Sequence, residues 1–185
     1  MSVDLCVFFS DAALPTRDEW QRVLEEEGTA LVLDQFSPRE DSGFLPATLN
    51  EEACGFEYSF GPITDEDFGD VRGELEEFGD FDRVVALTTH SNQLEGRAAM
   101  LAAGALAMFT GGVYFDPQGG NFVRIASVRE FAAEAEAEER AWRMEQAVKK
   151  WGRVTDRHCP KCGAPCPEYK LKCAVCDYEI GRAVS

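Results

Sequence analysis

RVVALTT at residues 83–89 and LEGRAAMLAAGALAMF at residues 94–109 are the two stretches that decide the fold of this chain. The first is rich in apolar and β-branched residues, which predicts a β-strand. The second carries apolar residues around nearly its whole circumference, so it predicts a helix that must be buried. The sequence on both sides must therefore supply strands and helices that enclose it.

Apolar stretches on both sides of this pair predict the remaining strands. Val3, Leu5, Val7 and Phe9 alternate with other residues, which is the period expected of a strand with one buried face. The predicted strands are 3–9, 29–34, 44–49, 56–60, 83–89, 113–115 and 122–125. Turn-forming residues between the third and fourth strands, and between the last two, predict antiparallel hairpins.

Three further helices are predicted. Thr16-x-x-Glu19 is a capping box that begins a helix ending at Gly28, and Ser127-x-x-Glu130 begins a long one that continues to about Trp151. A helix is also predicted over 64–79, although two glycines weaken it. Together these elements predict an α+β fold, with a mainly antiparallel sheet packed with helices.

Length and composition predict one ordinary domain followed by a small one. The chain has 185 residues, of which 45% are hydrophobic and 28% charged, as in a folded globular protein. We expect an acidic α+β domain over 1–152, ending in the long helix, and a small domain over 153–185. Asp4 interrupts the first apolar stretch and the longest apolar run, 98–109, is shorter than the about 20 residues of a membrane helix. These features predict a cytoplasmic protein with no membrane partner.

The two parts of the chain carry opposite charge. Residues 1–146 hold 30 Asp and Glu against 10 Lys and Arg, a net charge of −20, whereas residues 147–185 hold 4 against 8, a net charge of +4. A surface as acidic as that of the first part repels nucleic acid and anionic membranes and attracts basic proteins. The alternative is that the acidic residues only maintain solubility.

Five cysteines lie close together near the end of the chain and predict a metal site. Cys159-x-x-Cys162 and Cys173-x-x-Cys176 are separated by 10 residues, a spacing that allows two tight turns to direct four thiolates at one ion. We expect a structural zinc ribbon, with an iron–sulfur centre or redox dithiols as the alternatives. Cys166 or His158 can replace one of the four ligands, but Cys166 lies outside both turns and is interpreted as a spare thiol.

The sequence gives little support for catalysis. A site with four cysteine ligands has no open position for substrate, so its role is to stabilise a fold or to present a docking surface. Nucleic acid is a possible partner only of the ribbon, through its lysines and arginine. His90, after a predicted strand, is the one seat of catalysis in the large domain, yet neither a nucleophile elbow nor a phosphate-binding loop accompanies it. We therefore expect a protein that is not an enzyme. The basic residues through which the ribbon could contact nucleic acid are Lys161, Lys170, Lys172 and Arg182.

Three segments resemble a family of small bacterial cytoplasmic proteins that act as immunity proteins of polymorphic or contact-delivered toxins. These segments are SGFLP at 42–46, GFEYSFGP at 55–62 and TGGVYFDPQ at 110–118, and the resemblance covers about residues 3–133. It implies a protein that neutralises a cognate toxin, whose basic cleft the acidic surface would occupy. The ribbon lies outside the resemblance. The alternative is an adaptor or regulator that uses the ribbon to bind a protein or nucleic-acid partner.

Overall fold

The computed structural model describes residues 2–90, 93–137, 159, 161, 172, 173 and 176. The chain forms two compact units, Met1–Ala132 and Ala133–Ser185. The predicted domain boundary near residue 152 lies outside the described residues. The first unit has the predicted α+β class and contains a sheet of seven strands in the order β2-β3-β4-β5-β1-β6-β7.

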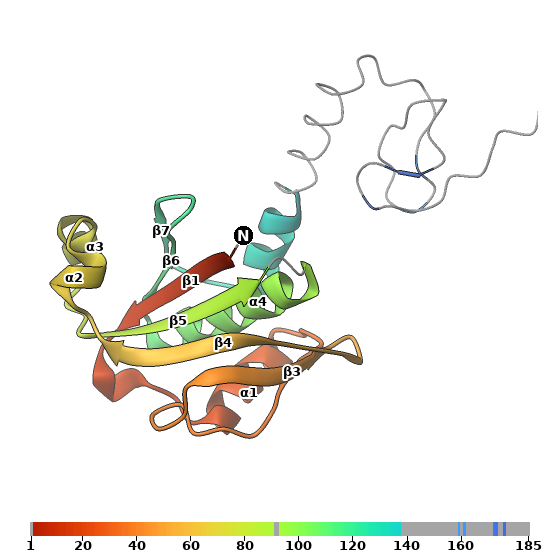
Figure 1. Ribbon diagram of the computed structural model, residues 1–185, viewed down its shortest axis with the longest axis horizontal. Helices are drawn as coiled ribbons and strands as arrows, with labels where there is room; N and C mark the ends of the chain where they lie inside the picture. The colour runs from red at the N-terminus through yellow and green to blue at the C-terminus, as the bar shows by residue number, and fades with distance from the viewer. Residues whose placement is uncertain are drawn as a thin grey trace, which may run out of the picture. The chain divides into compact units, whose positions relative to one another are not determined.

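Every strand pairing in this sheet is antiparallel (Figure 1). The central strands β1 and β5 pair over eight residues, from Ser2 opposite His90 to Phe9 opposite Arg83. Both predicted hairpins are present, as β3–β4 and β6–β7. The strands are β1 (Ser2–Phe9), β2 (Leu31–Leu33), β3 (Gly43–Leu49), β4 (Glu52–Pro62), β5 (Arg83–His90), β6 (Val113–Asp116) and β7 (Asn121–Val123).

Helices lie on both faces of the sheet, but they cover the two faces unequally. The helices are the 3₁₀ turn η1 (Asp11–Ala13), α1 (Arg17–Glu26), α2 (Asp65–Phe68), α3 (Arg72–Phe78) and α4 (Gln93–Thr110), and residues 128–137 are also helical. Helices α1 and α4 pack along one face, which forms the main core. Helices α2 and α3 pack at one end of the other face, against Phe8 and Phe115 (Figure 1).

Helix α4 is the centre of the main core, as its sequence predicts. Nine of its residues between Ala98 and Ala107 are buried. Small residues around Ala102 leave its carbonyl accessible, and Trp20 of α1 donates its indole N–H to this carbonyl at 2.9 Å in the buried interior. A Cβ at Gly104 would lie 3.2 Å from Cδ1 of Phe131, tighter than an ordinary contact. The glycine therefore lets the helix at 128–137 begin close against α4.

The predicted capping box of α1 is present. Thr16 Oγ1 accepts a hydrogen bond from the Glu19 amide, and Glu19 Oε2 accepts one from the Thr16 amide at 2.8 Å. These hydrogen bonds satisfy amide groups that no helical carbonyl can reach. The bond from the Thr16 amide is the main reason why the pKa of the Glu19 carboxyl lies below its usual range.

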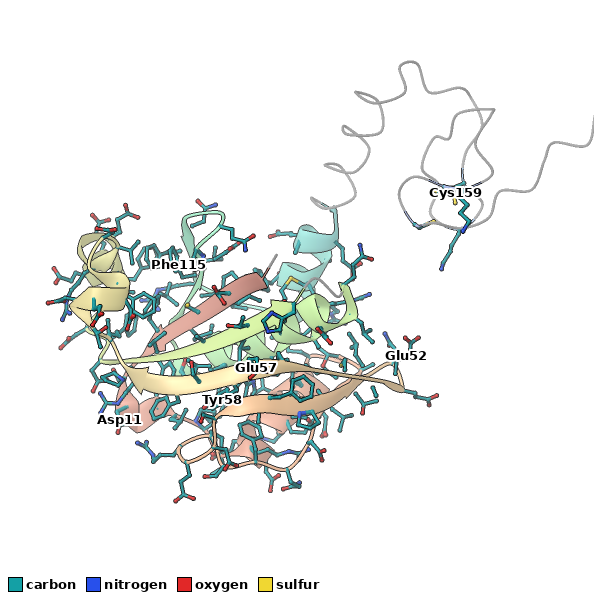
Figure 2. The ribbon with its side chains drawn as sticks, viewed as in Figure 1. Asp11, Glu52, Glu57, Tyr58, Phe115 and Cys159 are labelled. Carbon is teal, nitrogen blue, oxygen red and sulfur yellow. The ribbon has the colours of Figure 1, made fainter. Side chains whose placement is uncertain are left out.

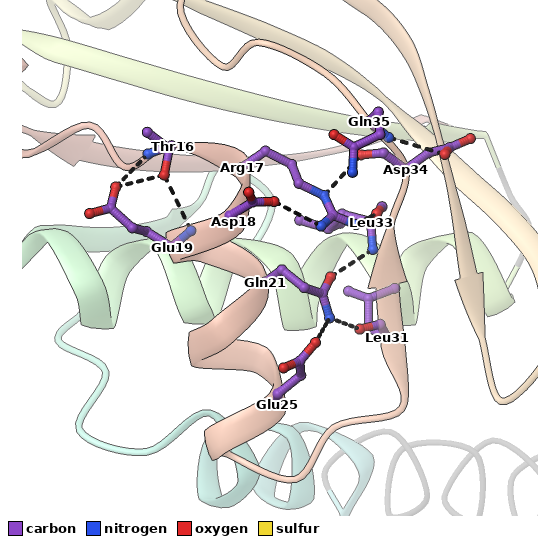
Figure 3. Close-up of polar contacts among 10 residues, drawn as sticks. All are labelled: Thr16, Arg17, Asp18, Glu19, Gln21, Glu25, Leu31, Leu33, Asp34 and Gln35. Atoms are coloured by element: carbon purple, nitrogen blue, oxygen red, sulfur yellow. Dashed lines mark hydrogen bonds and ion pairs between the residues drawn. The ribbon is translucent and has the colours of Figure 1, made fainter.

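The outer edge of β2 is closed by side chains of α1 rather than by another strand (Figure 3). The buried amide of Gln21 donates from Nε2 to the Leu31 carbonyl at 3.1 Å and accepts at Oε1 from the Leu33 amide at 2.9 Å. Arg17 also donates to the Leu33 carbonyl. An exposed strand edge invites pairing with another chain, and here the side chains of one helix occupy its hydrogen-bonding groups.

Replacing Gln21 should therefore destabilise the protein through the backbone of β2. Gln21→Leu keeps most of the volume but leaves the Leu31 carbonyl and the Leu33 amide without their partner, so we expect a loss of about 1–3 kcal/mol in the free energy of unfolding. Urea denaturation of the full chain measures this loss. Gln35→Ala, which removes an exposed glutamine next to the same strand, should change it by less than about 0.5 kcal/mol. Equal effects of the two variants would contradict the edge-closing role of Gln21.

The structure corrects the predicted elements in three places. The single helix predicted over 64–79 is wrong, because the segment forms the two short helices α2 and α3, and α2 ends at Gly69. The strand predicted over 29–34 is shorter, since only Leu31–Leu33 pairs with β3. The strand predicted over 56–60 is longer, because β4 continues to the turn at Asn50 and Glu51, two residues with positive φ.

The predicted helix start at Ser127 is confirmed, with an addition that the sequence did not reveal. Ser127 Oγ accepts from the Glu130 amide at 3.3 Å. The same hydroxyl donates to Oε2 of Glu27 at 2.8 Å, and the Arg129 amide donates to this oxygen at 3.3 Å. Glu27 thus joins the end of α1 to the first turn of the later helix, where a negative charge is favourable. The predicted continuation to Trp151 lies outside the described residues.

Glu27 should make a contribution to stability that depends on pH. The hydroxyl of Ser127 is the main cause that lowers the pKa of the Glu27 carboxyl below its ordinary value of 4.5, so the ionised form favours the folded state. This stabilisation is fully present above about pH 5 and is lost as the pH falls through the lowered pKa. We expect Glu27→Gln to be less stable than the parent near neutral pH, with a difference that shrinks below pH 4.5 in thermal unfolding.

The neighbouring Glu26→Gln is the matched control for this experiment. Glu26 is exposed, and its ion pair with Arg22 is long at 3.8 Å. Exposed pairs of this kind contribute little to stability, so the control should follow the parent at every pH. If Glu27→Gln were less stable than the parent by the same amount from neutral pH to below pH 4, the loss of stability would come from the changed shape of the side chain rather than from its charge.

No helix in the described part of the chain has the length and apolar character needed to cross a membrane.

Candidate metal centre and acidic surface

Three of the four cysteines predicted as ligands lie together. The Sγ atoms of Cys159, Cys173 and Cys176, which we call the cysteine cluster, all lie within 4.8 Å of one another. Cys159 is 2% exposed and Cys173 is 0% exposed, while Cys176 is partly buried. The cluster thus joins one cysteine of the first C-x-x-C motif to both cysteines of the second, as the spacing predicts.

The distances within the cysteine cluster fit a metal ion. Sγ of Cys159 lies 3.6 Å from Sγ of Cys176, much farther apart than the about 2.05 Å of a disulfide. Two thiolates bound to one zinc ion at about 2.3 Å in a tetrahedron would be about 3.8 Å apart. The Lys161 amide donates to Sγ of Cys159 at 3.4 Å, the kind of outer hydrogen bond that orients a thiolate ligand. The cluster can therefore hold a metal ion, and it is compatible with a small ribbon.

The fourth predicted ligand, Cys162, lies outside the described residues. Cys166 and His158, the two possible substitutes, lie outside them as well. Among the residues that the structure does describe, the cysteine cluster is the one group of three or more possible ligands whose donor atoms converge. The predicted site is therefore supported at Cys159, Cys173 and Cys176, and the choice of its fourth member stays a prediction.

One end of the sheet carries a dense group of acidic residues. Residues 65–82, which we call the acidic cap, form α2, α3 and the turn that leads to β5, and they include nine exposed carboxylates (Figure 2). Arg72, which bonds to Asp65, is the one cation within this segment. The nine are Asp65, Glu66, Asp67, Asp70, Glu74, Glu76, Glu77, Asp80 and Asp82.

Local structure explains some of these carboxylates but not all of them. The side chain of Thr64 caps α2. The acidic residues in the first turn of α2 are favourable there, because the N-terminus of a helix carries partial positive charge. Asp82 accepts from the Asp11 amide at 2.8 Å and pairs with Arg83. Glu66, Asp70, Glu76 and Glu77, in contrast, make no ion pair within the described part of the chain, so their negative charge faces solvent without compensation.

An ion-pair cluster that sequence reasoning missed lies beside the acidic cap. Asp11 Oδ1 is 2.9 Å from Arg39 Nη1 and 2.9 Å from Arg83 Nε, and the hydrogen bond from Arg39 is the main reason why the pKa of Asp11 is lowered. Arg39 follows Asp11 by 28 positions and Arg83 follows it by 72 positions, so nothing in the local sequence marks the three as partners. The single carboxylate is paired with two guanidinium groups, so the cluster anchors the end of the sheet and adds no negative charge to the free acidic surface.

His90 lies at the exposed end of β5, on the face opposite the main core. Its neighbours at 91 and 92 lie outside the described residues.

The two cysteines of the first unit lie in strands. Cys54 of β4 is partly buried, whereas Cys6 of β1 is buried, and this burial is the main cause that raises the pKa of its thiol to about 12. A thiol with so high a pKa stays protonated and unreactive near neutral pH.

The three segments from which we predict a resemblance to immunity proteins lie in or next to strands of the sheet. Residues 42–46 lie in and before β3, residues 55–62 lie in β4, and residues 110–118 connect α4 to the turn after β6. Comparisons with protein-family models, with curated proteins and with solved structures gave no match to the chain.

Metal analysis provides the direct test of the cysteine cluster. The purified full chain should contain about one equivalent of metal ion by plasma mass spectrometry. Cys173→Ser should lose it, because a buried ligand is removed from the shell. Cys54→Ser, which changes a cysteine of the first unit, should keep it. Retention of metal by the Cys173 variant, or absence of metal from the parent purified without chelator, would argue against the site.

Proposed function

We propose that this protein is a non-enzymatic protein-binding module that captures a basic protein partner through its acidic surface, and that it serves as an immunity protein against a bacterial toxin. The observation that carries the proposal is the set of uncompensated carboxylates on the acidic cap. These carboxylates are held on α2 and α3, whose apolar residues pack on the sheet beneath them. A cytoplasmic location, where thiols stay reduced and available to metal, fits the same proposal.

Electrostatics explains why such a surface suits a toxin inhibitor. Toxins that attack nucleic acid bind it through basic clefts, and a surface of the opposite charge can compete for the same cleft. The attraction reaches about 10 Å at 0.1 M salt and raises the rate of encounter. Charges at the rim of an interface act mainly on this association rate and on its dependence on salt. The resemblance of segments 42–46, 55–62 and 110–118 supports the same reading.

We also propose that the metal of the cysteine cluster is zinc and that its role is structural. Cys162 is the proposed fourth ligand, because its spacing from Cys159 matches that of Cys176 from Cys173. Thiolate sets of this kind select zinc or iron–sulfur centres, and a closed shell of four thiolates has no open position for substrate. When bound, zinc would supply the folding energy that a segment of about 30 residues cannot obtain from its own core.

A second candidate function is an adaptor or regulator in which the ribbon contacts nucleic acid or another protein. The observation that favours it is that Lys161 and Lys172 are exposed while the adjacent Cys159 and Cys173 are buried. A metal-held turn would then present two cations to a phosphate backbone. An RNA or DNA mobility shift that disappears in Lys161→Ala/Lys172→Ala and weakens with salt would favour this second function.

Charge reversal on the acidic cap tests the first candidate. The binding partner for the test is the toxin encoded beside the gene for this chain, where the genome carries one, and binding is followed by surface plasmon resonance at several salt concentrations. Glu76→Lys/Glu77→Lys should slow association by about tenfold or more at low salt and flatten its salt dependence. The two residues are exposed on α3 and make no ion pair with any residue that the structure describes, so the variant should keep the parent's stability.

The control carries the same change in net charge at another place. Glu26→Lys/Glu40→Lys alters exposed carboxylates outside the acidic cap and should slow association much less. The absence of a complex at micromolar concentration between the parent and the toxin would refute the proposal. Equal slowing by both variants would assign the effect to net charge alone and remove the acidic cap as a defined surface.

A further inference from the structure

The sheet face opposite the main core is covered by the acidic cap at one end only, and its other end is exposed. Helices α2 and α3 cover the end of this face around Phe8 and Val113. No helix of the described part of the chain covers the other end, which consists of parts of β1 to β5 (Figures 1 and 2). We call this end the open sheet face. Its outward side chains include Asp4, Val32, Phe44, Pro46, Glu57 and Thr88.

Four of these residues form a row across four neighbouring strands. Phe44 of β3 is the register partner of Glu57 in β4, Glu57 that of Thr88 in β5, and Thr88 that of Asp4 in β1. Each lies next to a residue of the main core, so all four point away from that core. Thr88 Oγ1 donates to Asp4 Oδ1 at 2.6 Å, which fixes this carboxylate. With strands about 4.8 Å apart, the row spans about 14 Å.

The aromatic ring at one end of the row is held in place although it is exposed. Phe44 is 56% exposed, yet its ring lies over Gly55, where a Cβ would come 2.4 Å from Cζ of Phe44. The absence of a side chain at Gly55 gives the ring a seat on the backbone of β4. Val32 of the neighbouring β2 is 52% exposed. An aromatic group whose position is fixed before binding loses little conformational entropy on binding, as at the energetic centre of many interfaces.

The charges around this ring determine the chemistry of a partner. Both charged members of the row, Glu57 and Asp4, are carboxylates, and an aromatic face also attracts cations. Beside Phe44, a groove of about 610 Å³ is lined by Val32 and Pro46 and includes the exposed acidic residue Asp34 at the end of β2. Glu95 of α4 lines the groove from the opposite face of the sheet. The cation in this groove, Arg17, is 16% exposed and bonds to the Leu33 and Asp34 carbonyls. Apolar contact and negative charge therefore occur side by side.

We propose that the open sheet face is the docking surface for a segment of the basic protein partner, in which arginine or lysine side chains alternate with apolar ones. One cation lies between the Phe44 ring and the Glu57 carboxylate, and a second reaches Asp4. An apolar side chain enters the groove between Val32 and Phe44. This inference rests on the proposed function and locates its contact surface, while the acidic cap accelerates the encounter from a distance.

A synthetic peptide separates this surface from the acidic cap. The probe is acetyl-Arg-Leu-Arg-Leu-Arg-amide, with acetyl-Gln-Leu-Gln-Leu-Gln-amide as its neutral counterpart, each titrated into the isotopically labelled full chain at low salt. We expect the basic peptide to shift the NMR signals of residues around Phe44, Glu57 and Thr88, and the neutral peptide to bind at least about fivefold more weakly, because it lacks the cations.

Matched variants test the individual contacts. Phe44→Ala and, independently, Glu57→Gln should each weaken binding of the basic peptide about fivefold to tenfold. Phe109→Ala removes a phenylalanine that is 36% exposed on α4, and Glu66→Gln removes one charge from the acidic cap. Neither control should weaken binding more than about twofold. Circular dichroism checks that every variant is folded, and Glu57→Gln keeps the test valid if Phe44→Ala is unstable.

Three outcomes would overturn the proposal. The first is signal changes confined to the acidic cap, with loss of binding in Glu66→Gln; it would leave the proposed basic partner intact but move its contact surface. The second is equal affinity for the two peptides, which would remove the requirement for cations. The third is a concentration-dependent change at Phe44 and Val32 without peptide, together with dimerisation in sedimentation experiments, which would assign the open sheet face to a second copy of the chain.

Discussion

Helix α4 presents alanine, leucine and glycine around nearly all of its middle turns, and the neighbouring elements are arranged so that they exclude water from it. The sheet lies on one side of it, α1 on another, and the beginning of the helix at 128–137 on a third. Because small side chains leave little space between layers, polar contacts across them are direct, as between Trp20 and the Ala102 carbonyl. Such a helix is stable only within these layers, since apolar groups on all sides would otherwise meet water.

Burying α4 on one face leaves the other face of the sheet with little to cover it. Two short helices cover one end and carry the densest group of carboxylates in the described residues, while the other end keeps Phe44 and Val32 exposed. Exposed apolar groups beside uncompensated acidic residues are typical of a binding surface rather than of a solvated one. The proposed division of roles follows from this arrangement: dispersed charge acts at a distance, and the fixed ring and its neighbouring carboxylates act on contact.

One edge and one end of the sheet are closed by specific side chains rather than by a further strand. Gln21 and Arg17 occupy the hydrogen-bonding groups on the outer edge of β2, and Arg39 and Arg83 share the carboxylate of Asp11 at the end of the sheet. Closing an edge in this way prevents pairing with another chain. The proposed partner would therefore meet the face of the sheet beside β2, where side chains rather than backbone groups would provide specificity. In the proposed ribbon, a metal ion held by the cysteine cluster would be a different source of stability, in place of a hydrophobic core that so short a segment cannot form.

The sequence by itself determined those features that depend on neighbouring residues. The apolar pattern of 83–89 and 94–109 predicted the central strand and the buried helix, Thr16 and Glu19 predicted the start of α1, and the C-x-x-C spacing predicted that Cys159 would meet Cys173 and Cys176. Only the tertiary structure decided the strand order, the Asp11 ion pairs, the bond from Ser127 to Glu27 and the row from Phe44 to Asp4. The physical reason is that capping, periodicity and tight-turn ligation act over a few residues, whereas these contacts join segments that local sequence does not mark as partners. Which residues face solvent together is fixed only when distant strands align.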